Sequence, residues 1–113
     1  MSLASKLQIP NGLKMWIINP PVGFEVDASS GNDSESGVIL FAHDAKTLKR
    51  IGKPAFEAAK ADRLTWIAYP KASQLGTDLN RDILVQLVKP MGIQPVRQVS
   101  VDDIWSALRF RPA

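Results

Sequence analysis

Apolar residues concentrate in three runs that are separated by polar stretches. These runs read, in chain order, "LKMWIIN", "GVILFAH" and "RLTWIAYP". They are rich in β-branched and aromatic residues, which favour strands, and they are nearly continuous, which is typical of strands covered on both faces. The pattern predicts parallel strands near residues 13–19, 38–43 and 64–69.

A helical stretch follows the second run. Asp44 is its predicted N-cap, and Gly52 and Pro54 divide it into helices over residues 44–52 and 54–61. After the third run, a longer helix is predicted over residues 78–91.

The longer helix has its own start and stop signals. Thr77 is the predicted N-cap, Asp78 suits the positive end of the helix dipole, and Gly92 ends the helix. On a helical wheel Asn80 falls in the middle of the apolar arc, whereas Asp82 faces solvent. We therefore expect Asn80 to bond buried backbone groups in the loop 71–76 rather than to act as a catalyst.

Two further segments complete the chain. Residues 20–37, "PPVGFEVDASSGNDSESG", predict a mobile loop with a short turn of helix near residues 24–28. The stretches "IQPVRQVSV" and "WSALRFR" predict an antiparallel hairpin at the C-terminus, although residues 104–110 also tolerate helix. Together the elements predict one α/β domain over residues 1–113, a three-layer sandwich with a mainly parallel sheet of five strands.

Composition restricts the function more than it identifies it. The chain has 113 residues, a net charge of +3, no cysteine and one histidine. No disulfide is therefore possible, a zinc centre has almost no ligands, and the aspartates show no metal-binding spacing, so we expect no metal site. No run reaches about 18 apolar residues and no signal-peptide core is visible, which favours a soluble cytoplasmic protein without a membrane segment, either a monomer or a weak homodimer.

Three motifs in the last two-thirds of the chain carry a resemblance. "WIAYPK", "TDLNRD" and "VDDIWSALRF" resemble the signature of an uncharacterised family of short bacterial proteins, a domain of unknown function. That family looks like a truncated Rossmann-type methyltransferase that lacks the middle of the nucleotide-binding half. The resemblance implies the strand order 1-2-3-5-4 and transfers no activity.

The turn after the first predicted strand bears on cofactors. A Rossmann-like site needs glycines there so that the backbone can approach the cofactor. The sequence has "NPPVGF", in which two prolines lack N–H donors and only Gly23 is a glycine. We expect no cofactor, neither S-adenosylmethionine nor a nicotinamide dinucleotide. The Asn-Pro-Pro triplet is interpreted as a rigid strand exit, since Val22 stands where amino-group methyltransferases have an aromatic residue.

The carboxyl ends of parallel strands are where open α/β sheets bind ligands. One hypothesis is a crevice there in which His43 is a general base and Lys71 its electrostatic partner; the other is that His43 only ends a strand and contacts Asp44 or water. The candidate ligand-binding residues at this end are Asn19, His43, Tyr69, Lys71, Ser73, Thr77, Asn80 and Arg81.

The tryptophans and arginines give a second candidate. Trp16 and Trp66 lie inside apolar strands and are predicted to be core, whereas Trp105 is predicted to be half exposed. A candidate interaction edge consists of Arg97, Trp105, Arg109 and Arg111. Such an edge suits a protein or single-stranded nucleic acid, but basic residues on an edge strand also prevent aggregation.

These observations favour a small noncatalytic interaction or regulatory domain on a relic methyltransferase-like scaffold. The alternative is a small enzyme or metabolite-binding protein that uses the strand-end crevice. Expected partners are a protein or a small metabolite, and nucleic acid is disfavoured because the basic residues are scattered.

Overall fold

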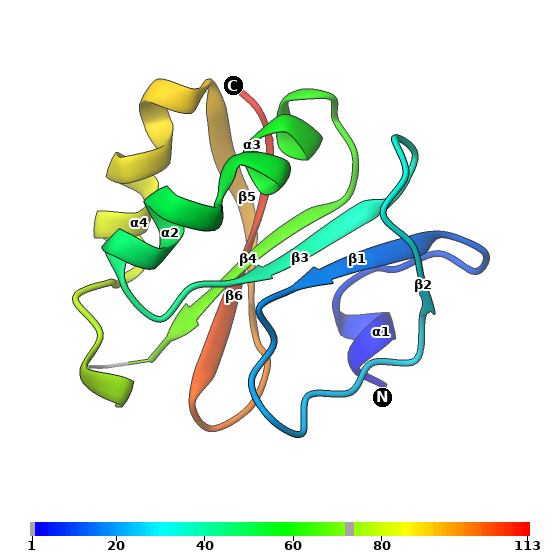
Figure 1. Cartoon of the computed structure of the whole chain (residues 1–113), viewed down its shortest axis with the longest axis horizontal. Helices are drawn as coiled ribbons and strands as arrows, with labels where there is room; N and C mark the ends of the chain where they lie inside the picture. The colour runs from blue at the N-terminus through cyan, green and yellow to red at the C-terminus, as the bar shows by residue number, and fades with distance from the viewer. Residues whose placement is uncertain (1, 72–73) are drawn as a thin grey trace.

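A six-stranded mixed sheet forms the centre of the computed structural model, which describes residues 2–71 and 74–113 (Figure 1). The strands follow one another across the sheet in the order β2-β1-β3-β4-β6-β5. The strands are β1 (Lys14–Ile18), β2 (Ser29–Ser30), β3 (Gly37–Phe41), β4 (Thr65–Pro70), β5 (Ile93–Ser100) and β6 (Trp105–Pro112). The helices are α1 (Leu3–Lys6), α2 (Ala45–Ile51), α3 (Lys53–Lys60) and α4 (Arg81–Val88), with short 3₁₀ turns η1 (Gln74–Gly76) and η2 (Lys89–Met91).

The three apolar runs form β1, β3 and β4, which pair in parallel. Every residue of β3 and β4 is buried, as expected for strands covered on both faces. Gly37 begins β3 where a side chain would not fit, because a Cβ there would lie 2.6 Å from Met15 Sδ and 2.9 Å from the Leu64 carbonyl oxygen.

The C-terminal hairpin is present as β5 and β6. These strands pair antiparallel, and β6 also pairs antiparallel with β4. Residues 105–112 are therefore strand, which resolves the alternative of a helix over residues 104–110. The ladder is irregular between Pro95 and Arg97, where Val96 is an additional residue on β5.

The segment 20–37 differs from the prediction. It contains no helix near residues 24–28, and its two-residue strand β2 pairs in parallel with the start of β1, so the sheet has six strands rather than five. Phe24 and Val26 pack against the sheet. These apolar contacts hold an extended chain, which explains why turn-forming residues around them do not produce a helix.

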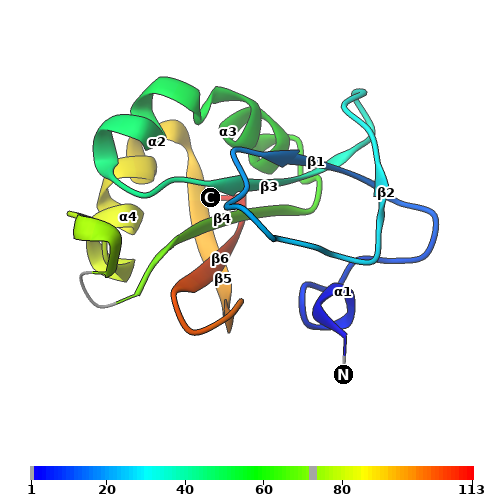
Figure 2. The same cartoon turned by 60° about the horizontal axis from the view of Figure 1, so that its bottom comes forward.

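Two apolar clusters lie on opposite faces of the sheet. The first is formed by α2, α3 and α4 with one face of β3, β4 and β6, and includes Leu48, Leu84 and Phe110. The second lies beneath α1 and the segments around it, and includes Leu7 and Trp66. Figure 2 shows α2 and α3 on one side of the sheet and α1 on the other. The third layer is therefore one short helix with extended chain.

The helix breaks occur close to their predicted positions. Asp44 is the N-cap of α2, and its carboxylate accepts from the Thr47 N–H at 2.7 Å. Gly52 separates α2 from α3 because a Cβ there would collide with the Leu48 carbonyl group. Gly92, with φ of 79°, ends the turn after α4.

Candidate functional site

The predicted strand-end residues lie at one end of the sheet, but each is held by a different neighbour. Asn19 follows β1 with φ of 57°, and its side-chain amide donates to the Phe41 carbonyl at 3.0 Å. This bond joins the ends of β1 and β3. The amide nitrogen of Asn19 is thus already engaged in joining two strands.

His43 follows β3 and points toward solvent. Its side chain is 49% exposed, and its Nε2 lies 3.2 Å from Asp44 Oδ2. The Thr47 backbone N–H, which bonds the same carboxylate, holds the pKa of Asp44 below its ordinary value. Within the described part of the chain, His43 therefore contacts this N-capping aspartate and not a nucleophile.

Tyr69 and Lys71 belong to the junction between β4 and the hairpin. Tyr69 is buried, and burial raises the pKa of its phenol. The Lys71 ammonium donates to Ser100 Oγ at 2.6 Å and to the Asp102 carbonyl at 2.5 Å. Lys71 therefore fastens the β5–β6 turn to the end of β4.

The start of α4 differs from the prediction. The helix begins at Arg81, and Asn80 is its N-cap, with Oδ1 accepting from the Ile83 N–H at 2.8 Å. Thr77 instead accepts from the Leu79 N–H at 3.0 Å in the turn before the helix. The helical wheel was wrong for Asn80, which is exposed and extended, because a wheel places only residues inside the helix.

Asp78 and Arg81, from the same motif, have different surroundings. Asp78 does not serve α4; its carboxylate accepts from the Ala45 N–H at the start of α2, at 2.8 Å. Arg81 is exposed, and its guanidinium lies 3.9 Å from Asp82. Ser73 lies outside the described residues. The polar residues of "TDLNRD" thus cap two helices.

The predicted burial of the tryptophans is wrong at two of the three positions. Trp66 is fully buried as expected, but Trp16 is 37% exposed and Trp105 only 6% exposed. Trp105 lies edge-on against Phe41, with ring centroids 5.2 Å apart. It is buried because β6 pairs with β4, which places Trp105 in the apolar cluster against which Phe24 also packs. Trp16 is exposed because β1 lies near the edge of the sheet, beyond α2 and α3 (Figure 1).

Two cavities flank Trp16, and we call them together the Trp16 groove. The first, of about 350 Å³, lies between β1 and the start of α3. The second, of about 340 Å³, lies where β2 ends beside β1. The first has Val38 and Pro54 among its apolar lining, and its charged lining residues are Asp33, Lys53, Glu57 and Arg63. Arg63 is oriented by a 2.9 Å bond from Nη1 to the Ser36 carbonyl.

The predicted interaction edge is assembled in part. Arg97, Arg109 and Arg111 all lie on the C-terminal hairpin, whereas Trp105 is buried. Arg111 makes two bonds to Asp62, at 2.9 and 3.0 Å. Arg109 donates from Nη1 to Gln8 Oε1 at 2.8 Å. The edge is therefore basic without an exposed aromatic ring from Trp105.

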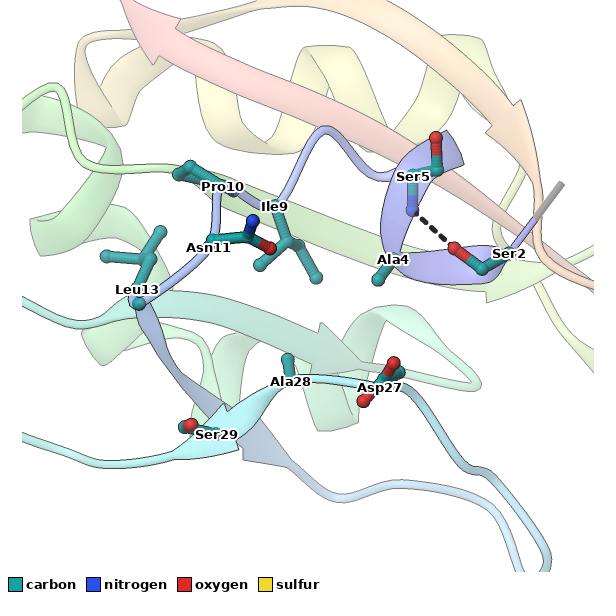
Figure 3. Close-up of a pocket in the computed structure, with 11 residues that line it drawn as sticks. Ser2, Ala4, Ser5, Ile9, Pro10, Asn11, Leu13, Asp27, Ala28 and Ser29 are labelled. Atoms are coloured by element: carbon teal, nitrogen blue, oxygen red, sulfur yellow. Dashed lines mark hydrogen bonds between the residues drawn. The ribbon is translucent and has the colours of Figure 1, made fainter.

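The largest of the described cavities, about 560 Å³, lies between the N-terminal segment and the start of β2 (Figure 3). Ser2, Asn11 and Asp27 contribute polar groups to it. Figure 3 shows Ser2 and Ser5 joined by the bond that caps α1, so part of this polarity is used locally. The cavity offers neutral hydrogen-bonding groups and one carboxylate, which is not a catalytic set.

Sequence reasoning missed the Trp16 groove. One signal was present, since residues 20–36 predict only a short turn of helix, which is too short to cover β1 on the side of α2 and α3. Within residues 2–71 and 74–113, no three acidic or histidine side chains are close enough to hold a metal ion. None of the helices in the described chain has the length and apolar character needed to cross a membrane. The sequence matches no family model and no curated protein.

Proposed function

We propose that this chain is a small noncatalytic interaction domain, on a scaffold similar to a truncated methyltransferase, and that its partner binds in the Trp16 groove. The observation that carries the proposal is Trp16 itself. Its neighbours on the same face of the sheet, in β3 and β4, are covered by helices, whereas its own side chain is 37% exposed between two cavities.

The groove has the mixed character of a protein-binding site. Tryptophan is enriched among residues that dominate binding energy, because a large apolar ring loses its contact with water on binding while its N–H still makes a hydrogen bond. Val38 and Pro54 extend the apolar area beside the ring. Lys53 and Glu57 provide exposed charges of both signs at the rim, which orient a partner more than they add affinity.

The strand-end residues support a noncatalytic reading. Asn19 and Lys71 donate to groups within the fold, and His43 contacts the aspartate that caps α2. A general base needs a nucleophile or substrate proton within hydrogen-bond reach, and a third group to orient it. The contacts found here hold the ends of strands and helices together instead.

The experiment uses the tagged full chain as bait for extracts of its source cells, beside two variants. Trp16→Lys places a charge in the groove, and Ile83→Lys is the matched control because Ile83, on α4, is similarly exposed at 42%. A partner of the groove is retained by the wild type and by Ile83→Lys, and lost by Trp16→Lys. The purified partner then shields Trp16 from quenching by acrylamide, since Trp66 and Trp105 are already buried.

Thermal-shift screening with nucleotides and small metabolites tests the alternative function. Ligand binding to the folded state raises the melting temperature. A metabolite that stabilises the wild type and Trp16→Lys, but not His43→Ala, would contradict the interaction-domain proposal in favour of a strand-end binding site. A captured partner that binds both lysine variants equally would contradict the assignment of the groove.

A further inference from the structure

The C-terminal hairpin carries two arginines on the same face of the sheet. Arg97 of β5 and Arg109 of β6 are cross-strand partners, so their side chains point to the same side. Arg109 also pairs with Trp66, whose ring belongs to the cluster on the α1 side. The two arginines therefore lie on the side of the sheet opposite α2, α3 and α4.

Within the described chain, no acidic side chain bonds either of these arginines. Arg97 is exposed, and Arg109 donates to the neutral amide oxygen of Gln8. The Nε of Arg109 is buried and has no acceptor among the described residues. Arg111 shows the contrast, because the bidentate pair with Asp62 neutralises it.

This arrangement costs folding stability that a partner can restore. Like charges at directly opposed positions of two strands destabilise a sheet. A buried guanidinium donor without an acceptor adds a desolvation penalty. An anion that reaches Arg97 and Arg109 relieves the repulsion between their two positive charges. The local charge of the hairpin thus favours an acidic partner.

β5 also presents an open edge. It is the last strand of the sheet, so its outer side pairs with no strand of the described chain. Val96, at the irregular position of the ladder, is 48% exposed. An edge of this kind can accept an extended segment through main-chain hydrogen bonds.

We propose that an extended acidic segment of a partner protein adds to the edge of β5 and places carboxylates on Arg97 and Arg109. Alternate residues of an extended segment point to one face, so its acidic side chains gather on the side of the sheet where the two guanidinium groups lie. Arginine suits this task because its planar donors match both oxygens of a carboxylate.

A protein segment fits better than single-stranded nucleic acid. Binding of single strands combines basic residues with exposed aromatic rings on which the bases stack. Both aromatic residues of β6 are buried: Trp105 is only 6% exposed and packs on Phe41, and Phe110 is fully buried. The hairpin therefore offers charge and an open edge without the ring of Trp105.

This proposal does not rest on the Trp16 groove. Trp16 lies on β1, separated from the hairpin by β3 and β4, and its ring points to the side of α2 and α3. The Trp16→Lys variant should therefore leave binding at the hairpin unchanged, so the two proposals fail separately.

The test measures fluorescence anisotropy of a labelled peptide in which Glu and Thr alternate, titrated with the full chain. Arg97→Gln removes one charge from the hairpin, and Arg50→Gln is the matched control because Arg50 is exposed on α2. We expect Arg97→Gln to weaken binding about tenfold, and Arg50→Gln by less than about twofold, because a charge-assisted bond is lost only in the first. Circular dichroism checks that both variants fold.

Four results would overturn the proposal. Equal weakening by Arg97→Gln and Arg50→Gln, or no binding at a millimolar concentration of the chain, would mean that the arginines are not a binding site. A peptide of the same composition with its Glu residues in one block should bind more weakly, and equal binding would refute strand addition. Tighter binding of an oligothymidine with the same number of charges would replace the acidic segment with nucleic acid.

Discussion

The carboxylate of Asp78 accepts a 2.8 Å hydrogen bond from the backbone N–H of Ala45, so the turn before α4 caps the start of α2. Asp44 bonds Thr47 at the same helix end, and two carboxylates thus serve one helix of seven residues. We predict that Asp78→Ala lowers the free energy of unfolding by about 1 kcal/mol, as loss of a cap does. Asp82→Ala, four residues away and exposed, should change it by less than about 0.5 kcal/mol. Urea denaturation of both variants measures the difference, and equal losses would contradict this role of Asp78.

Asn80 gives the second prediction, since its amide oxygen caps α4. Asn80→Ala should lower the free energy of unfolding by about 1 kcal/mol, because the Ile83 N–H loses its acceptor. Asn80→Ser should lower the free energy of unfolding by only a few tenths of a kcal/mol, since a serine hydroxyl can cap in the same position. If serine were as destabilising as alanine, the cap would not be the reason that Asn80 matters. Thermal and urea denaturation of the three proteins provide the comparison.

The Asp62–Arg111 pair predicts a dependence of stability on pH. The hydrogen bond from Arg111 holds the pKa of Asp62 below its ordinary value of 3.8. A lowered pKa means that the folded state prefers the charged carboxylate, so this contribution to stability is present above about pH 4 and is lost as the pH falls through the lowered pKa.

The test compares the wild type with Asp62→Asn, an exchange that suits the positive φ of 60° at this position. The difference in free energy of unfolding between them should be largest near neutral pH and should shrink as the pH falls below about 4. Arg111→Gln should remove the same pH-dependent part. A difference that stays constant down to about pH 2 would show that the ion pair does not cause it.

Much of the fold follows from the periodicity of apolar residues. The runs that become β3 and β4 are buried on both faces, so their apolar residues are continuous and point to strands without ambiguity. The helix breaks at Gly52 and Gly92 could also be predicted from sequence. A Cβ would collide with the Leu48 carbonyl group at position 52, and Gly92 adopts a positive φ that other residues rarely adopt. β2 was not readable, since Ser29 and Ser30 form a strand only through their pairing with β1.

The candidate site was less predictable for a physical reason. Burial of Trp16 and Trp105 depends on which elements cover β1 and β6, and that is set by contacts between distant segments. The start of α4 was misplaced because Thr77 and Asn80 are both good N-cap residues, and local sequence does not say which one caps. Arg97 and Arg109 were identified from sequence, but their opposed positions required the strand register.

The last prediction separates the structural tryptophan from the exposed one. Trp66 is fully buried and its indole N–H donates to the Leu7 carbonyl at 2.9 Å, which joins β4 to the N-terminal segment. Trp66→Phe should lower the free energy of unfolding by about 2 to 4 kcal/mol, since it leaves a buried carbonyl without its donor and a space where the larger ring was. Trp16→Phe should cost less than about 1 kcal/mol, because Trp16 is partly in solvent already.

The same two variants distinguish the rings by fluorescence: acrylamide quenching of the folded protein should fall most in Trp16→Phe. Comparable destabilisation by both substitutions, or quenching that persists without Trp16, would mean that Trp16 is core and would remove the basis of the Trp16 groove.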